Sequence, residues 1–279
     1  MNTEMRTISA GNSFASSMRE LWQYRDLVML FVRRDFVSIY KQTILGPLWI
    51  VLQPLLTTIT YTIIFSRIAG ISTGGVPPIL FYLCGIIPWT YFAECLNKTS
   101  NTFIANSNIF GKVYFPRLAV PVSIIISNLI SMGVQFLLFA LIMSIYIIKG
   151  ETVFSLQSSL LLIPFFVLLL AMLGLGIGLM VTALTTKYRD LRFLVTFGVQ
   201  LLMFATPVIY PISSVSGKLK TIIELNPVSP IIEGMRHALL HSGQLDASKL
   251  LFSSIVVIFT LIAGIFLFNR VEKDFMDTV

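Results

Sequence analysis

The chain has 279 residues, of which 56% are hydrophobic and 12% are charged, and its mean hydropathy is +0.85. No soluble domain of this length needs so much apolar surface, so the composition predicts a membrane protein with several spans. The net charge of +7 does not indicate nucleic-acid binding, because the cations lie in short segments between apolar runs.

The N-terminal part of the chain predicts a polar tail followed by an amphipathic helix. Residues 1–22 lack the apolar core of a cleavable signal. After them, helical periodicity places apolar side chains on one side and cations opposite or on the flank. Such a helix is expected at the level of the lipid headgroups, with its apolar side towards the membrane. The apolar positions are Val28, Val32, Phe36 and Ile39, and the cations are Arg33, Arg34 and Lys41.

Charge-free stretches predict an all-α membrane protein with six transmembrane helices. Each stretch reaches the roughly 20 residues that a helix needs to cross a bilayer. Gly46 and Pro47 mark the bend into the first span. The turn at 70–78 makes the second helix begin near Ile79 and continue to about Phe103. The stretches are 42–66, 68–93, 118–148, 152–186, 193–217 and 250–269.

The segment 212–248 contains two short apolar runs, Thr221 to Leu225 and Pro230 to Leu240. Neither run is long enough to span the bilayer. A single crossing here would also place the C-terminal cations on the outer side. We therefore expect two short re-entrant helices between spans 5 and 6, which a membrane tolerates where protein or water covers the backbone.

The distribution of Lys and Arg predicts the orientation. With six spans and a cytoplasmic N-terminus, fourteen of the twenty cations lie on the inner side and six on the outer side. Cytoplasmic loops carry the excess of Lys and Arg, so both termini are expected in the cytoplasm.

Motifs for nucleotide or metal chemistry are absent from the sequence. It contains no phosphate-binding loop of the G-x-x-x-x-G-K-[ST] type, no H-E-x-x-H and no C-x-x-C. His237 and His241 lack an evident third metal ligand, and Cys84 and Cys95 lie about 16 Å apart along one predicted helix, too far for a disulfide. If ATP drives this protein, another chain must bind it.

Few ionisable or polar groups lie within the predicted spans. Glu94 and Lys98 are spaced to pair along one helix face, either as a self-neutralised pair near the inner interface or as part of a cytoplasmic entrance. Gly174 and Gly178 form a G-x-x-x-G pattern, with Gly176 between them, that is typical of closely packed helices. The third span has a polar seam that either lines a passage or bonds to neighbouring helices: Ser123, Ser127, Asn128, Ser131 and Gln135.

Three stretches together carry a family resemblance. They are RRDFVSIYKQTILGPLWIVLQPLL from Arg33, GIIPWTYFAECLNKTSNTFIANSNIFGKVYFPRLAVP over Gly85 to Pro121, and NPVSPIIEGMRHALL over Asn226 to Leu240. With the tail Val271 to Met276, they resemble the ABC-2 type permeases that form the membrane subunits of polysaccharide ABC exporters, and they look most similar to the O-antigen branch.

The resemblance implies a transport permease rather than an enzyme. It implies a homodimer in the bacterial inner membrane, assembled with two copies of an ATP-binding cassette protein that binds ATP and Mg, and a lipid-linked polysaccharide as substrate. One transmembrane domain would cover 1–279, with a cytoplasmic tail and interface helix at 1–42, the six-span part at 43–270, its outer gate at 212–248 and a cytoplasmic tail at 271–279.

The resemblance also suggests four groups of site residues. Composition alone would make the loop 106–121 a plain connector, whereas the resemblance gives it a coupling helix that contacts the ATPase; its expected anchors are Phe110, Lys112, Tyr114, Phe115 and Arg117. Lipid headgroups would enter at Arg33, Arg34 and Lys41, which equally suit interfacial anchoring. The glycan passage would be lined by Trp49, Trp89, Tyr91 and Phe92, although lipid belts and core packing also use aromatics. The outer gate would include Asn226, Pro227, Glu233 and Arg236.

Two alternatives remain open. The first is an ABC-2 permease for a drug or a small lipid. The second is a membrane-embedded glycan-processing enzyme, which would need catalytic carboxylates at a membrane face; Glu224, Glu233 and Asp246 have no partner that the sequence identifies.

Overall fold

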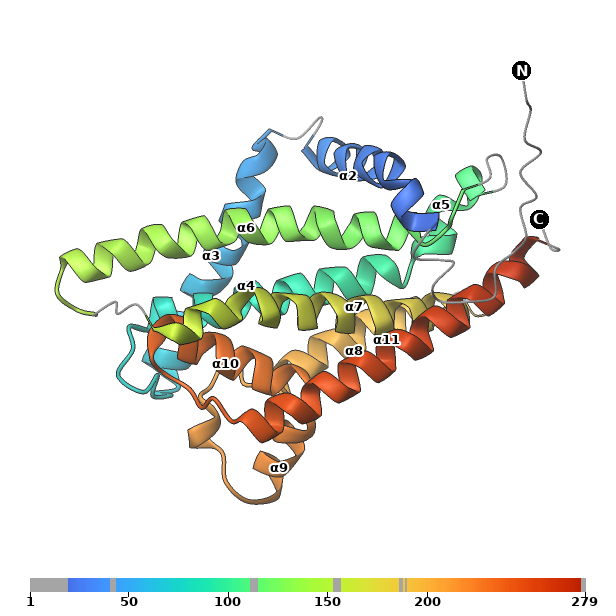
Figure 1. Ribbon diagram of the computed structural model, residues 1–279. Coiled ribbons are helices and arrows are strands. Elements are labelled where there is room, and N and C mark those ends of the chain that lie inside the picture. Colours follow the sequence, from blue (N-terminus) through green and yellow to red (C-terminus); the bar gives the residue numbers. More distant parts are fainter. Residues whose placement is uncertain are drawn as a thin grey trace.

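The computed structural model describes residues 20–40, 44–110, 115–152, 157–185, 188 and 190–276. This part of the chain is helical and contains no strand. Figure 1 shows the helices in chain order. They are α2 (Arg25–Tyr40), α3 (Trp49–Tyr61), a π-helical segment (Thr62–Ile68), α4 (Pro78–Thr99), α5 (Thr102–Phe110), α6 (Ala119–Ile148), α7 (Ile163–Thr185), α8 (Leu191–Phe204), α9 (Gly217–Leu225), α10 (Val228–Leu240) and α11 (Ala247–Met276).

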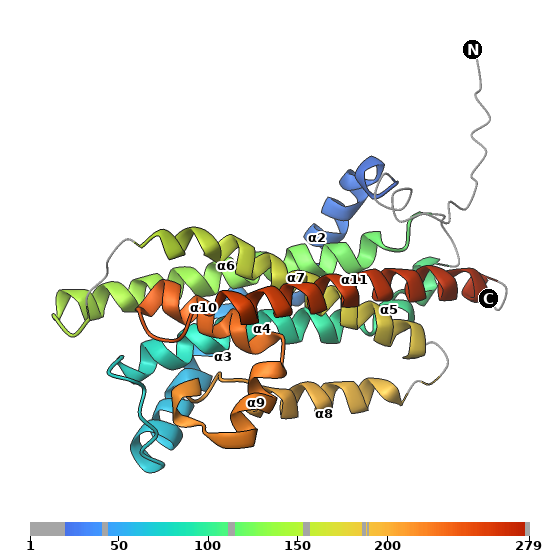
Figure 2. The same ribbon diagram turned by 60° about the horizontal axis from the view of Figure 1, so that its bottom comes forward.

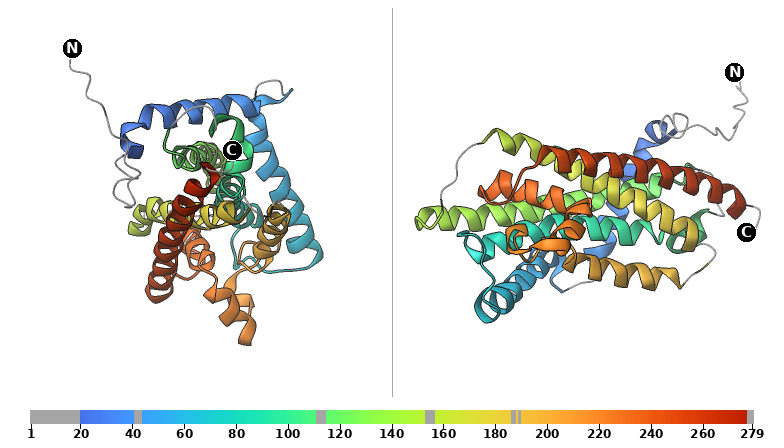
Figure 3. Two further views of the ribbon diagram at one scale, coloured as in Figure 1. Left: turned by 90° about the vertical axis from the view of Figure 1, so that its right-hand side faces the viewer. Right: turned by 90° about the horizontal axis from the view of Figure 1, so that it is seen from below.

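The helix α4 forms the centre of the bundle. It is apolar on all sides over residues 79–89, as an enclosed helix must be, and the residues from Leu80 to Trp89 are all buried. Its neighbours are α3, α6, α7, α8 and α10. Seen along the bundle, α3 descends at the edge at a steep inclination to the other helices (Figure 3). The molecule is therefore a bundle around α4, with α3 crossing its side.

Glycines let α7 pack closely against helices on two of its sides. A Cβ on Gly174 or Gly178 would lie 2.9 Å or 2.6 Å from side-chain atoms of α4. A Cβ on Gly176 would lie 2.8 Å from the backbone of Leu261 in α11, where Gly264 also meets the Gly176 backbone. This confirms the close packing that the G-x-x-x-G pattern predicted.

Among the described residues, five helices are long and apolar enough to cross a membrane. They are α3 with its π-helical extension, α4, α6, α7 with the short turn before it, and α11. The helix α8 has 14 residues, so it is about 21 Å long against a hydrocarbon core of roughly 30 Å. The predicted second helix ends earlier than expected, at Thr99, and α5 begins at Thr102.

The two ends of the bundle hold different elements. The start of α2, the helix α5 and the end of α11 lie at one end, which we call the α5 end (Figure 1, Figure 2). The helices α9 and α10 lie towards the other end, which we call the α10 end. An even number of crossings would bring the first and last helices to the same end in this way.

The buried side of α2 faces protein. Val28 and Val32, expected to contact lipid, are buried, and α2 packs against α6. Arg34 pairs with Asp35 at 2.8 Å and lies over the Phe31 ring at 4.7 Å. The expectation that the apolar side meets the membrane was wrong at Val28 and Val32, because α6 and the α5 region cover that side. The side chain of Ile39 and all of Lys41 lie outside the described residues.

Candidate functional site

A cavity of about 200 Å³ lies between α3, α4, α6 and α8, within the part of the chain predicted to be in the membrane. Two tryptophans that sequence reasoning assigned to a passage, Trp49 of α3 and Trp89 of α4, both line it. Flat aromatic faces and uncharged polar groups therefore meet in one space. The other lining residues that carry this character are Gln53, Thr57, Tyr61, Thr90 and Gln135.

Pro54 explains why a glutamine lies in this cavity wall. A proline within a helix has no amide N–H, so the carbonyl four residues earlier, that of Ile50, loses its helical partner. Gln135 of α6 supplies the missing donor, because its Nε2 lies 3.4 Å from the Ile50 oxygen. The glutamine of the polar seam thus satisfies backbone in α3, as buried backbone within a membrane requires.

Tyr91 and Phe92 do not line the cavity. Both are buried, and Phe92 packs against Trp89 with ring centroids 5.6 Å apart. Residues two positions apart on a helix point in nearly opposite directions, so Trp89 and Tyr91 cannot face the same space. In this conformation they belong to the core around α4, and their assignment to the passage stays a prediction.

A polar cluster lies beside the cavity. Glu94, which lines it, pairs with Lys98 at 2.9 Å, as the spacing predicted. Lys98 Nζ also donates to Oδ1 of Asn128 on α6 at 2.9 Å, and Asn128 Nδ2 approaches Cys95 Sγ at 3.7 Å. The cavity is thus bordered by a neutralised ion pair that α6 holds in place.

At the α10 end, the backbone after α8 is buried but not helical. Thr206, Pro207 and Val208 are buried, so their carbonyls need hydrogen-bond partners within the protein. Arg236 of α10 provides them. Its guanidinium donates to the carbonyls of Pro207, Val208 and Tyr210, and it lies 3.9 Å from the centroid of the Phe81 ring.

Arg236 is held by a second buried charge. Its Nη1 lies 3.0 Å from Glu233 Oε1, and the two side chains are 1% and 4% exposed. A buried guanidinium without a carboxylate partner would be strongly destabilising, so the pair and the carbonyls form one unit. The predicted gate residues Glu233 and Arg236 therefore fix the non-helical segment 205–210 against α4.

Asn226 and Pro227 hold the same segment from the α9 side. Asn226 Nδ2 donates to Thr206 Oγ1 at 2.8 Å and to the Ala205 carbonyl at 3.2 Å. Its Oδ1 accepts from the Val228 amide, the first of α10, at 3.0 Å. The Pro227 carbonyl accepts from Ser253 of α11. The structure thus brings all four predicted gate residues to one region, while their role as a gate stays a prediction.

The predicted coupling residues lie at the α5 end. Phe110, Phe115 and Arg117 are buried, with Arg117 5.5 Å from the Phe110 ring centroid and Phe115 5.5 Å from that of Phe31 in α2. Their side chains fill the space between α2 and α5, so in this conformation they are not surface anchors for a partner. Lys112 and Tyr114 lie outside the described residues, and the coupling role of the loop stays a prediction.

Comparison with known proteins identifies the chain's family. The family profile described as ABC-2 type transporter matches residues 26–240, which include α2, the cavity and the segment with Arg236. The chain belongs to the ABC-2 type transporter family. This transporter subunit is therefore not an enzyme in its own right.

Three relatives cover most of the transporter. An "O-antigen export system permease protein RfbA" of Klebsiella pneumoniae is 28% identical over 255 residues, 90% of this chain and 94% of its own length. A protein of the same name from Myxococcus xanthus is 25% identical, covering 94% and 98%. The "Polysialic acid transport protein KpsM" of Escherichia coli is 24% identical, covering 84% and 89%.

The predicted entrance cations of the transporter are only partly described. Arg33 is exposed on α2, and Arg34 is held by Asp35 and Phe31. Lys41 lies outside the described residues. Nothing in these contacts distinguishes headgroup binding from interfacial anchoring, so both interpretations stay predictions.

Sequence reasoning missed Gln53 and Met203 as cavity residues of the transporter. Gln53 lies four residues after Trp49, on the same face of α3, and this spacing could have identified it. Met203 had no such signal, because its place depends on how α8 packs against α3, where the Tyr61 hydroxyl lies 3.7 Å from its sulfur.

Proposed function

We propose that this ABC-2 transporter chain is the membrane subunit of an exporter that moves a lipid-linked polysaccharide of the O-antigen type across the bacterial inner membrane. Two copies would form a homodimer with two copies of a separate ATP-binding cassette protein, which binds ATP and Mg. The observation that most supports polysaccharide export is the cavity in which Trp49 and Trp89 meet uncharged polar groups. The permeases named for O-antigen export support this substrate class.

The chemistry of the cavity suits a sliding sugar chain. Tryptophan faces can stack on the apolar faces of sugar rings, while few hydrogen bonds hold a given ring in place. The only cavity-lining carboxylate among the described residues, that of Glu94, is paired with Lys98. A glycan can therefore pass without meeting an unpaired charge at this point.

The remaining elements take roles around the cavity. The helix α8 and the segment 205–210 together make the fifth crossing in chain order, which brings the total to six, and α9 and α10 form a re-entrant outer gate between it and α11. Both termini would lie in the cytoplasm, and the loop 106–121 would contact the ATPase. The lipid headgroup would enter at Arg33, Arg34 and Lys41. Arg34 touching Phe31, and Phe31 touching Phe115, would link entrance and coupling loop.

The test replaces the tryptophans in cells whose own permease gene is deleted. Trp49→Ala and Trp89→Ala should each lower the rate at which polysaccharide reaches the outer face. Aromatic contacts are worth about 0.5–1.5 kcal/mol, which corresponds to a roughly 2- to 13-fold loss per tryptophan. Trp49→Phe and Trp89→Phe should retain most activity. Export is measured by labelling surface polysaccharide after induction.

Trp22 provides the matched control, because it is 72% exposed and lies before α2, away from the cavity. Trp22→Ala should export at the wild-type rate. If the double variant Trp49→Ala/Trp89→Ala assembles at normal yield and exports like the wild type, the cavity is not the passage.

One observation favours a second candidate, export of a drug or small lipid. Within one chain the cavity holds only about 200 Å³, which is narrow for a chain of sugar rings. In the deletion strain, this function would leave surface polysaccharide unchanged and raise sensitivity to the drug or retention of the lipid instead.

A further inference from the structure

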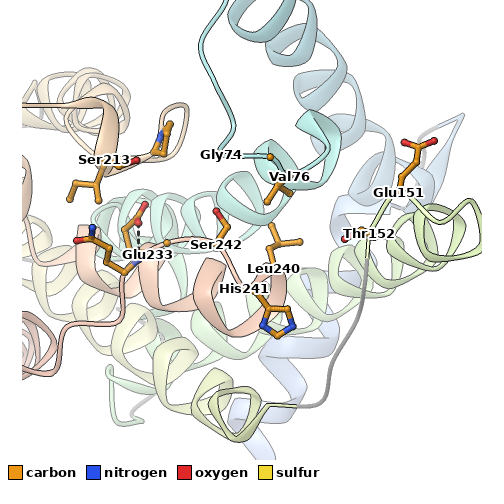
Figure 4. A pocket seen from close by; sticks show the side chains of 14 residues that line it. Gly74, Val76, Glu151, Thr152, Ser213, Glu233, Leu240, His241 and Ser242 are labelled. Atoms are coloured by element: carbon orange, nitrogen blue, oxygen red, sulfur yellow. Dashed lines mark hydrogen bonds between the residues drawn. The ribbon is translucent and has the colours of Figure 1, made fainter.

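A second, larger pocket lies at the α10 end, apart from the aromatic cavity. Its volume is about 670 Å³, within the roughly 300–1,000 Å³ typical of small-ligand sites. It is formed where the turn before α4, the residues after α6, the segment after Tyr210 and the C-terminal end of α10 meet (Figure 4). Four separate parts of the chain thus build one concave surface.

The lining of this pocket is mostly polar and includes the imidazole of His241 (Figure 4). Hydroxyl groups come from Thr152, Ser213 and Ser242, and carboxylates come from Glu151 and Glu233. Figure 4 shows the two carboxylates at opposite ends of the pocket, with Ser242 between them. Among the described lining residues there is no Lys or Arg. Such a surface offers acceptors and hydroxyls to a ligand that donates hydrogen bonds.

Glu233 is a fixed part of this surface. Its side chain is 4% exposed, and Oε1 is bound by Arg236 at 3.0 Å. The other oxygen, Oε2, accepts a hydrogen bond from the Gln244 amide at 3.3 Å, and both residues line the pocket. The acceptor is therefore oriented before any ligand arrives, which lowers the entropic cost of binding.

Gly243 allows the loop after α10 to close over Glu233. Its φ is +101°, and a Cβ there would lie 2.9 Å from the Glu233 carbonyl and 3.1 Å from Oε2. Only glycine fits this approach without displacing the carboxylate. The wall around Glu233 is thus a defined structure rather than a chance gap between loops.

We propose that this pocket binds an uncharged, hydroxyl-rich ligand, a short segment of neutral glycan, at the outer face of the transporter. The proposal rests on the proposed function and adds to it a docking site for sugar residues that have left the passage. The carboxylate of Glu151 and the lack of a described lining Lys or Arg disfavour anionic sugars, while Arg236 balances the charge of Glu233. No three His, Cys, Asp or Glu side chains in the described chain are grouped to hold a metal ion, so a sugar suits the pocket better than a cation.

The test measures binding of maltotetraose, a neutral oligosaccharide, and of a sialic acid trimer to the purified exporter in nanodiscs by saturation-transfer NMR. Maltotetraose should bind saturably, and the sialic acid trimer should bind much more weakly. Ser213→Ala/Ser242→Ala should weaken maltotetraose binding at least about fivefold, because two ligand hydrogen bonds are lost. Ser214→Ala is the matched control, since this neighbouring hydroxyl does not line the pocket and should leave binding unchanged.

Several outcomes would overturn the proposal. Maltotetraose could fail to bind saturably, or the sialic acid trimer could bind equally well. Ser214→Ala could weaken binding as much as Ser213→Ala/Ser242→Ala does. Binding could also be lost on adding EDTA, which would indicate a bound cation. ATP-dependent polysaccharide export by the same purified exporter, reconstituted in sealed proteoliposomes, separates the two proposals. Normal export without pocket binding refutes the pocket alone, whereas absent export with intact pocket binding refutes the proposed function.

Discussion

Arg236 is a charged side chain without exposed surface, and its neighbours show why Arg rather than Lys occupies this position. It serves three carbonyls, one carboxylate and one aromatic ring at once. A planar guanidinium presents several donors in fixed directions and stacks on a ring, whereas an ammonium group does neither. The buried, non-helical segment after α8 therefore depends on this side chain, together with Asn226, for its hydrogen bonds.

Gly85 of α4 lies directly against Arg236 and leaves no room for a side chain. A Cβ on Gly85 of α4 would lie 2.8 Å from Arg236 Nη2 and 2.9 Å from the Val208 carbonyl. Gly85→Ala should therefore lower the free energy of unfolding by about 1–3 kcal/mol, the usual cost of overpacking. The measurement is thermal unfolding of the purified protein in detergent.

Gly133 of α6 is the control for that experiment. Nothing lies within 4 Å of the position that its Cβ would take. Gly133→Ala should leave stability unchanged or raise it by up to about 1 kcal/mol, since alanine favours the helix. Equal melting temperatures for the two variants would show that the contact at Gly85 is not tight.

At the scale of elements, the contact between α7 and α11 depends on two glycines. Gly264→Val would force a branched side chain against the Gly176 backbone. We expect a large loss of folded, monodisperse protein in size-exclusion chromatography, because α7 cannot move away from α11 without disturbing its own tight contact with α4. Gly198→Val in α8 carries the same change of residue type where nothing lies within 4 Å, so it should keep normal yield. A normal yield of Gly264→Val would contradict the close contact.

Element positions were largely predictable, because charges are expensive inside a bilayer and therefore mark where spans end. The predicted stretch 118–148 matches α6 at Ala119–Ile148. The stretch 193–217 did not predict the end of α8 at Phe204, although Pro207 and Pro211 are signals that a helix cannot continue. The directions of Tyr91 and Phe92 were not predictable, since α4 is apolar around most of its circumference and its rotation depends on the packed neighbours.

For the whole molecule, the orientation can be tested with single cysteines. The native Cys84 and Cys95 are both buried, so they should react little with a membrane-impermeant maleimide. Lys218→Cys at the start of α9 should be labelled on intact spheroplasts. Asp190→Cys, just before α8, should be labelled only after the membrane is permeabilised, because we place it in the cytoplasm. The reverse pattern would invert the proposed orientation.

The hydrogen bond between Gln135 and the Ile50 carbonyl also has a consequence for how this protein can change over generations. The two residues lie 85 positions apart, yet the need for the bond arises from the ring of Pro54. A descendant with a non-proline residue at position 54 regains the backbone N–H that bonds to the Ile50 carbonyl. The buried side-chain amide of Gln135 then has lost its acceptor. Inheritance should therefore couple positions 54 and 135, with substitutions at one followed by substitutions at the other.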